Sequence, residues 1–288
     1  MKMPFAARSL TLLLAALLLA AAPAAALAAE GPSCRYPAGL FNLNLSDELQ
    51  GPLFGPVKKA TLRSGESYWS ASFGRDGRPF SREQFVPGVI NEVVVYEAGR
   101  PVKRIDNPGT DRQAIIAVRY DGAGRAFKLL VPGPGGAVTE AGGGTLTPQG
   151  QVAAKTFRYG GTVYEAVYEY GPAGLVTREV AHMTNRGTVT VERAFDKAGR
   201  ILSRLQVGSS RPDGPPTADG QNKLDYRYDL KGQLIDIYFQ TDKSAAGVPF
   251  AIQAVYDDHG NWTRLAMARR DPGGQMNIQV FTQEIEYY

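Results

Sequence analysis

The stretch YDDHGNWTR, Tyr256–Arg264, decides the fold because it joins an aromatic residue, an acid directly after it and a glycine four positions on. An acid that opens a type I turn accepts a hydrogen bond from the backbone N–H two residues later. The glycine adopts the left-handed conformation that other residues resist. A type I turn followed by a left-handed residue is the three-residue loop of a β-hairpin with a bulge. The stretch therefore predicts the tip of a hairpin.

The same corner occurs at seven earlier places, so the chain contains an internal repeat. The eight units begin at Phe73, Tyr96, Tyr120, Leu146, Tyr170, Phe195, Tyr228 and Tyr256. The predicted structural turn residues are Tyr120, Asp121, Gly124, Phe195, Asp196, Gly199, Tyr228, Asp229, Gly232, Tyr256, Asp257 and Gly260. The second residue after the glycine is apolar in every unit. We expect the leading aromatic residue to face it across the hairpin.

This pattern predicts an all-β fold of tandem antiparallel hairpins that form a curved or rolled sheet with one buried face. Two Gly/Pro-rich stretches, residues 131–150 and 207–222, interrupt the regular spacing and are predicted to be loops. Three arrangements would protect the edge strands from aggregation. The last strand pairs with the first, residues 29–60 cover an edge, or the protein forms dimers. The sequence does not choose among them, and it leaves the oligomeric state open.

The first thirty residues are typical of a secretory signal peptide, with Lys2 and Arg8 before a short apolar run and Ala26-Leu27-Ala28 as the cleavage site. We therefore predict three segments: a signal peptide at 1–28, an N-terminal lead-in or cap at 29–60, and the repeat domain at 61–288. The chain without its leader is predicted to be periplasmic or secreted and not membrane-spanning. Its net charge falls from +4 to +2, because Lys2 and Arg8 are removed. A charge this close to zero argues against a nucleic-acid partner.

Few residues have the character of a catalytic or metal site. Cys34 is the single cysteine and His182 and His259 are the only histidines, so the sequence predicts no internal disulfide, metal site or cofactor. Either histidine could take part in serine hydrolysis, but no Gly-x-Ser-x-Gly elbow accompanies it, and we predict no catalytic residues. Acidic pairs that could hydrolyse glycosidic bonds are Asp257/Asp258, Asp225/Asp229 and Glu284/Glu286. Each pair is better explained as a turn cap or a solvated strand face.

The corners at Tyr120, Phe195, Tyr228 and Tyr256 resemble the YD repeat of the bacterial RHS family, and the stretch from Tyr256 to the C-terminus is similar to the end of small exported RHS-repeat-like proteins. The resemblance covers residues 60–288. It implies an antiparallel sheet of hairpins that curls on itself, and some family members are associated with carbohydrate binding at the cell surface. We expect no toxin domain after the last repeat, unlike in the large members of the family.

These observations lead to one functional hypothesis and two alternatives. The hypothesis is a non-catalytic exported repeat protein that binds or scaffolds an envelope polysaccharide or another exported protein. Exposed aromatic residues would form its binding platform, namely Tyr226, Tyr228, Tyr238 and Trp262. The first alternative is an enzyme that acts on cell-wall polysaccharide through an acidic pair. The second is a partner that packages or neutralises a secreted toxin.

Overall fold

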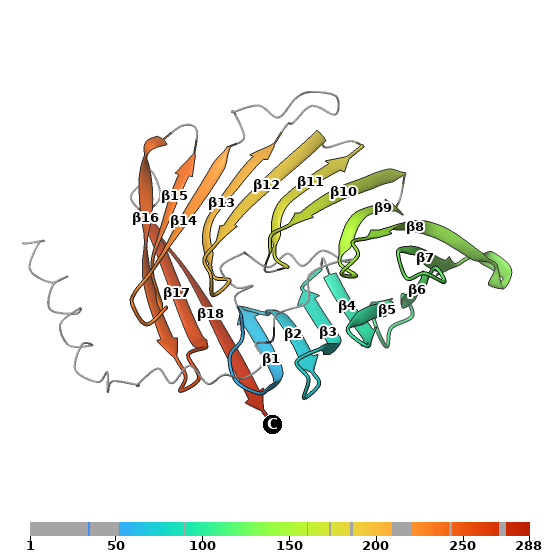
Figure 1. Cartoon of the computed structure of the whole chain (residues 1–288), viewed down its shortest axis with the longest axis horizontal. Coiled ribbons are helices and arrows are strands. Elements are labelled where there is room, and N and C mark those ends of the chain that lie inside the picture. Colours follow the sequence, from blue (N-terminus) through green and yellow to red (C-terminus); the bar gives the residue numbers. More distant parts are fainter. Residues whose placement is uncertain are drawn as a thin grey trace, which may run out of the picture.

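The protein folds into a closed antiparallel β-barrel of eighteen strands, as seen in a computed structural model (Figure 1). The structure describes residue 34 and residues 52–88, 90–159, 161–172, 174–184, 187–208, 221–241, 244–270 and 275–288. The predicted signal peptide and almost all of the predicted lead-in lie outside these residues. Within the described ranges, no helix has the length and apolar character needed to span a bilayer.

Every strand pairs with its neighbours in the sequence, so the order around the barrel is the order along the chain. The strands are β1 Val57–Ser64, β2 Ser67–Phe73, β3 Pro79–Val86, β4 Ile90–Glu97, β5 Arg100–Asp106, β6 Ala114–Tyr120, β7 Ala126–Pro132, β8 Val138–Leu146, β9 Val152–Tyr159, β10 Thr162–Tyr170, β11 Val176–Met183, β12 Gly187–Phe195, β13 Ile201–Gly208, β14 Asn222–Tyr228, β15 Leu234–Thr241, β16 Ser244–Tyr256, β17 Trp262–Arg270 and β18 Met276–Tyr287. A short 3₁₀ turn, η2, spans Pro134–Gly136.

The all-β fold of antiparallel hairpins is confirmed, but the predicted curved or rolled sheet is wrong in its shape. The sheet closes because β18 pairs with β1, from Val57 opposite Tyr287 to Arg63 opposite Thr282. The first of the three arrangements for edge protection is therefore the one present, and the closed ring leaves no open edge among the described strands. The barrel begins at Val57, four residues before the predicted domain boundary.

The corners form as predicted. The glycine of all eight units has a positive φ, for example +83° at Gly232 and +86° at Gly260. The acid also accepts the expected backbone hydrogen bonds: Asp229 Oδ1 accepts from the N–H groups of Lys231 at 2.9 Å and Gln233 at 2.8 Å. The local turn chemistry is therefore sufficient to place eight hairpin tips at one end of the barrel.

The predicted register is confirmed in seven of the eight units. In these units the leading residue faces the second residue after the glycine, as in the pairs Phe195–Ile201 and Tyr256–Trp262, and a bulge lies just before the leading residue. The unit at Tyr120 differs, because Tyr120 faces Phe127 and not Ala126. Its turn is one residue longer: the Asp121 N–H donates to the carbonyl of Ala126, five positions on.

The leading tyrosines also connect neighbouring hairpins, a contact that the pattern of a single corner does not predict. The Tyr120 hydroxyl donates to the Pro101 carbonyl at 2.9 Å, and the Tyr170 hydroxyl donates to the Val152 carbonyl at 2.8 Å. Each acceptor belongs to the preceding corner. Arg200, which follows the glycine of one corner, lies over the Tyr228 ring of the next, with 4.9 Å from its Cζ to the ring centroid. The corners are therefore linked around the rim.

The predicted loop at 131–150 is wrong for most of its length, because Val138–Leu146 forms strand β8. Three consecutive glycines, 142–144, allow this strand to lie very close to its neighbours. A Cβ atom on Gly142 would collide with the carbonyl oxygen of Thr156, and one on Gly144 with the carbonyl oxygen of Ala154. Glycine is needed here for a close approach of backbones. Most of the second predicted loop lies outside the described residues.

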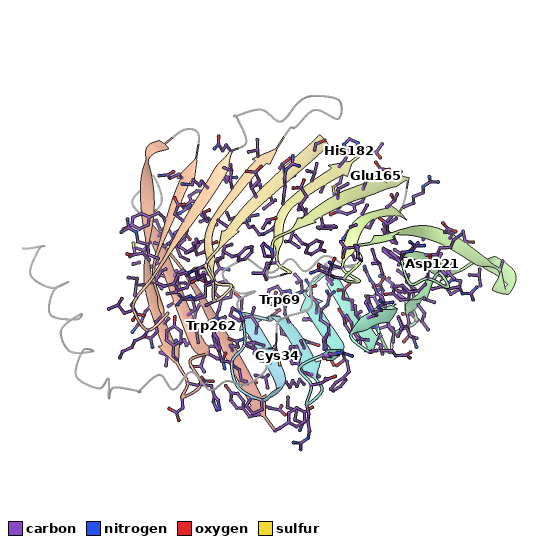
Figure 2. The ribbon with its side chains drawn as sticks, in the orientation of Figure 1. Cys34, Trp69, Asp121, Glu165, His182 and Trp262 are labelled. Atoms are coloured by element: carbon purple, nitrogen blue, oxygen red, sulfur yellow. The ribbon has the colours of Figure 1, made fainter. Side chains whose placement is uncertain are left out.

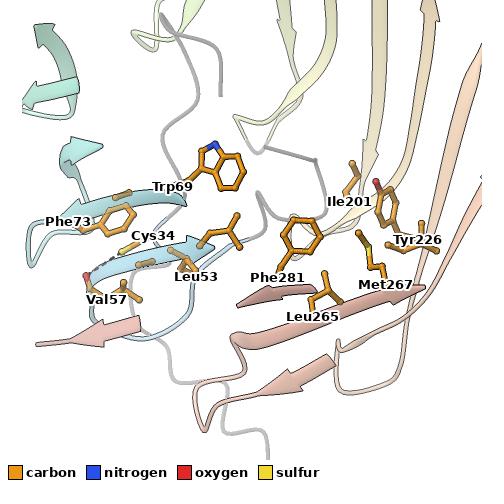
Figure 3. Close-up of a cluster of buried hydrophobic side chains, with 14 residues drawn as sticks. Cys34, Leu53, Val57, Trp69, Phe73, Ile201, Tyr226, Leu265, Met267 and Phe281 are labelled. Carbon is orange, nitrogen blue, oxygen red and sulfur yellow. Dashed lines mark hydrogen bonds between the residues drawn. The ribbon is translucent and has the colours of Figure 1, made fainter. Parts of the chain in front are cut away.

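Two apolar clusters fill the barrel interior. The larger one brings β1 and β2 into contact with strands from β13 to β18, so walls far apart in the sequence pack directly on each other (Figure 3). Leu62, Phe281 and Leu265 are among its buried members. Cys34 is a free, buried thiol in the same cluster and pairs with Leu53 through an isolated β-bridge. The smaller cluster lies within β4–β9 and includes Val94, Phe127 and Leu129.

The outer face of the barrel carries charged residues on strands around the ring. Successive side chains of a strand point to opposite faces, so the buried Tyr226 of β14 places Lys223, Asp225 and Arg227 on the outside. Outward ion pairs include Arg63–Glu284 and Arg178–Glu169, whose atoms lie 3.6 Å and 2.7 Å apart. The outside of this barrel therefore carries many charged side chains, together with exposed apolar residues such as Val167, Val255 and Ile278.

Candidate ligand site inside the barrel

A group of charged side chains points into the barrel from β3, β4 and β5. These strands place Arg82, Glu92 and Arg104 inward at alternating positions, with Val94 paired opposite Arg82 and Arg104. Glu92 accepts a hydrogen bond from Arg82 and lies 3.1 Å from Nε of Arg104, which also bonds Asp106 at 2.6 Å. Arg82 is 1% exposed and Glu92 is 4% exposed. Two guanidinium groups therefore share one buried carboxylate.

The facing strands β9, β11 and β12 contribute Lys155, Glu179 and Arg193. Lys155 is 5% exposed, and its Nζ lies 5.3 Å from the ring centroids of both Tyr164 and Tyr168. Glu179 Oε2 lies 3.6 Å from Nη2 of Arg193. A lysine buried in this way keeps its ammonium group next to aromatic faces, which attract cations.

Charges from both groups act on the pKa of Lys155. Burial lowers this pKa most, Glu179 raises it, and the positive charges of Arg82 and Arg104 lower it, so that it lies at about 8. Burial also raises the pKa of the nearby Tyr168 above its usual value. We call this set the interior polar cluster; it consists of Arg82, Gln84, Glu92, Arg104, Asp106, Lys155, Glu179 and Arg193.

Two buried polar side chains, Gln84 of the cluster and Trp69 beside it, have no hydrogen-bond partner among the described residues. The unpartnered atoms are the amide oxygen and nitrogen of Gln84 and the indole N–H of Trp69. The two residues face each other across the β2–β3 pair, and Gln84 also pairs with Glu92 across β3–β4. Gln84 is 1% exposed and Trp69 is 8% exposed, and Figure 2 shows Trp69 inside the ring of strands.

A buried polar group that lacks a partner costs about 1–3 kcal/mol, so native proteins seldom keep one unless it meets water or a ligand. Here the unpartnered groups lie together and next to buried cations. This arrangement is suited to holding a small polar molecule.

A small cavity lies at the end of the barrel where the corners gather. Its volume is about 70 Å³, and its lining includes the aromatic residues Tyr228, Tyr256 and Trp262. Phe54 also lines it and is held by Asn261, which accepts from the Phe54 N–H at 2.7 Å and donates to the Phe54 carbonyl at 2.8 Å. The cavity is smaller than most ligand sites.

The four predicted platform residues do not share one surface. Tyr226 is buried in the larger apolar cluster, while Tyr228 and Trp262 line the small cavity. Tyr238 lies on the outer face, where Arg227 covers its ring at 4.7 Å. A continuous exposed platform is therefore not formed, because alternate positions of β14 and β15 point to opposite sides of a closed wall.

The acidic pairs suggested for an enzyme have structural partners. Asp257 caps its turn and accepts a hydrogen bond from the Tyr287 hydroxyl. Asp225 pairs with Lys223 at 2.8 Å, and Glu286 lies 3.8 Å from Lys58 on the outer face. His182 and Glu165 are opposite each other on the outside of β10 and β11 (Figure 2). Among the described residues, no group of three or more metal-ligating side chains comes together.

Sequence reasoning missed the interior polar cluster. A usable signal existed in β3, whose sequence PFSREQFV places Arg82 and Gln84 at alternate positions, where a buried strand face would carry apolar residues. Charged residues are usually assigned to the solvent face of a strand, and only the pairing of β3 with its neighbours shows that this face is inside.

Comparisons with known proteins give little about identity. No family model matches the chain, and no curated protein matches it. A porin-like protein from Bacteroides uniformis is a similar solved structure, with 9% sequence identity, a TM-score of 0.46, and coverage of 81% of this chain and 99% of that one. A likeness this weak carries no argument about function. The resemblance to the RHS family is not tested by these comparisons and stays a prediction.

The predicted repeat-protein scaffold is wrong. That hypothesis required a sheet of tandem repeats with an accessible aromatic face. The hairpins instead form the wall of a single eighteen-stranded barrel, and aromatic residues such as Trp69, Tyr226 and Phe281 lie in its buried core.

Proposed function

We propose that the protein is an exported barrel that holds one small polar solute at the interior polar cluster, without transforming it chemically. The proposal is carried by the unpartnered amide of Gln84 beside the unpartnered indole of Trp69, both buried and both next to ion-paired charges. Export rests on the predicted leader. Binding without catalysis is favoured because the carboxylates of Glu92 and Glu179 are already committed to arginines.

The chain has two tryptophans, and this allows a direct test. In the Trp262→Phe variant, Trp69 is the only tryptophan and reports on the interior. A panel of sugars, amino acids, carboxylates and phosphate should include at least one solute that changes its emission in a saturable way and raises the melting temperature. The Trp69→Phe variant keeps only Trp262, near the small cavity, and is the control. If no solute changes Trp69 emission or the melting temperature, the proposal is wrong.

A second candidate function is a solute channel in an outer membrane. It is favoured by the even number of strands and the neighbour-to-neighbour closure, which are typical of outer-membrane barrels. Charged residues among the exposed apolar side chains of the outer face argue against it, since an Arg or Lys facing lipid near the midplane costs about 2–4 kcal/mol. Lys223 and Arg227 of β14 both face outward.

Fractionation and conductance distinguish the two candidates. A channel must be recovered with membranes and must conduct ions when it is added to a planar lipid bilayer. A solute-holding barrel that stays in aqueous buffer without detergent and gives no conductance would exclude the channel.

A further inference from the structure

We propose that the solute carries a small neutral carboxamide group, which is held between Gln84 and Trp69. This inference rests on the proposed function and names the chemical class that the same site accepts. Three features of the described residues carry it: the place of the unpartnered side chains, the kinds of hydrogen bond that they can form, and the pairing of the charges around them.

The two unpartnered side chains lie at one place in the barrel wall. Trp69 and Gln84 are directly opposite each other across the β2–β3 pair, so their Cβ atoms are about 4.5–5.5 Å apart. Both point inward, and they are 8% and 1% exposed. Figure 3 shows the indole nitrogen of Trp69 on the side of the ring that faces away from Phe73 and Phe281. A compact ligand that contacts one of these side chains can therefore contact the other.

The unpartnered atoms require a ligand that both donates and accepts hydrogen bonds. The Gln84 amide has an oxygen that accepts and a nitrogen that donates, and neither has a partner among the described residues. The Trp69 N–H, which can only donate, has none there either. An oxyanion offers acceptors alone and leaves the Gln84 oxygen unmet, whereas an ammonium group offers donors alone and leaves both N–H groups unmet. Exchanging the two ends of the Gln84 amide changes neither result.

A carboxamide meets all three atoms with one planar group. Its N–H donates to the Gln84 oxygen while its oxygen accepts from the Gln84 nitrogen, and the two amides then lie edge to edge. The second lone pair of the same oxygen accepts from the Trp69 N–H. A hydroxyl group also has one donor and two acceptor sites, but these share a single atom. It therefore cannot form straight hydrogen bonds with both ends of the Gln84 amide.

The charges near Gln84 favour a neutral ligand. Glu92 pairs with Gln84 across β3–β4. One carboxylate oxygen of Glu92 bonds Arg82, and the other lies 3.1 Å from Nε of Arg104. On the facing strands, the carboxylate of Glu179 lies beside cationic side chains. These charges therefore already have partners of opposite sign. An ionic ligand would bring a further charge into a place where charges are poorly screened, and a carboxamide brings none.

The experiment compares three small molecules of nearly the same shape, namely acetamide, acetone and acetate. Binding is measured by isothermal titration calorimetry and by the melting temperature of the protein. Acetone lacks the nitrogen donor and has no charge, and acetate lacks the donor and is charged. Acetamide should bind with saturation and raise the melting temperature. Acetone and acetate should bind at least about tenfold more weakly, because each leaves the Gln84 oxygen unpartnered.

Two variants test the place of binding. Gln84→Met removes the amide and should weaken acetamide at least about tenfold. It should not destabilise the protein, because the lost amide has no partner among the described residues. Trp69→Phe should weaken acetamide but keep its preference over acetone, because the amide pair with Gln84 remains. Gln253→Met, at an exposed position of β16, is the matched control and should leave the affinity unchanged.

The outcomes separate this inference from the proposed function. Acetone or acetate binding as tightly as acetamide, or an unchanged acetamide affinity in Gln84→Met, overturns the carboxamide at this place. The comparison of the three molecules decides even if Gln84→Met does not fold. If none of the three binds but another solute of the wider panel does, the carboxamide is wrong and the solute-holding function stands. If no solute binds, both proposals fail.

Discussion

Replacing Asn261 by alanine should destabilise the barrel at the place where it closes. The Asn261 side chain is 3% exposed and makes three hydrogen bonds. Two join it to the backbone of Phe54, before β1, and the third runs from its Nδ2 to the Tyr287 hydroxyl in β18, at 2.8 Å. One side chain of the last corner therefore connects both ends of the described barrel.

The size of the effect can be worked out from these contacts. A hydrogen bond contributes about 0.5–1.5 kcal/mol, so the loss of three should lower the free energy of unfolding by about 3 kcal/mol. For a domain of this size, 1 kcal/mol corresponds to about 2–4 °C in melting temperature. The melting temperature should therefore fall by about 6–12 °C.

Urea titration and thermal denaturation, each followed by circular dichroism, measure the change. The matched control is Asn277→Ala, at an exposed position of β18 whose side chain makes no hydrogen bond with the described part of the chain. We expect the control to stay within about 0.5 kcal/mol of the original protein. An Asn261→Ala variant as stable as the original protein would show that barrel closure does not depend on the hydrogen bonds of Asn261.

Two further predictions concern the corners and the interior. Gly232→Ala and Gly260→Ala both place alanine at a positive φ, which costs about 1–2 kcal/mol. The two positions differ in their surroundings. A Cβ at 232 would collide with the Arg200 guanidinium, whereas a Cβ at 260 has no atom within 4 Å. Urea titration should show Gly232→Ala to be the less stable by about 1 kcal/mol or more, and equal losses would contradict the packing of Arg200. For Lys155, whose folded pKa of about 8 lies below its unfolded value of 10.5, the unfolded chain holds the extra proton between these values. Stability should therefore rise from pH 8 to 9, by at most about 1.4 kcal/mol, and Lys155→Met should show no such rise in denaturation curves measured across that range. Above pH 9, tyrosines whose pKa is raised by burial, such as Tyr96 and Tyr120, act in the opposite direction because they ionise first in the unfolded chain.

The hairpin corners could be predicted because everything that forms them lies within a few residues. At Asp196, the carboxylate accepts from the Arg200 N–H at 2.9 Å, and Gly199 supplies the left-handed residue. The unit at Tyr120 shows the limit of this local reasoning. Its Asp121 accepts from both Arg125 and Ala126, and this lengthens the turn by one residue.

The candidate site could not be predicted in the same way. Gln84 and Trp69 are fifteen positions apart, and Lys155 lies on a strand far from both of them in the sequence. Whether a strand position faces inward depends on which side of the sheet is enclosed, and alternation alone does not define that side. For this reason the predicted platform residues Tyr226 and Tyr238 do not share one surface but lie on opposite faces of the wall.

The sequence by itself determined the alternation of strands and hairpin corners, the left-handed glycines and the pairing register of seven of the eight hairpins, because these depend on short-range sterics and hydrogen bonds. Only the tertiary structure decided that the hairpins close into a barrel, and that a group of charges is turned inside it. Closure joins Val57 to Tyr287 and depends on the twist summed over all the strands between them. No local stretch of the sequence determines that total twist.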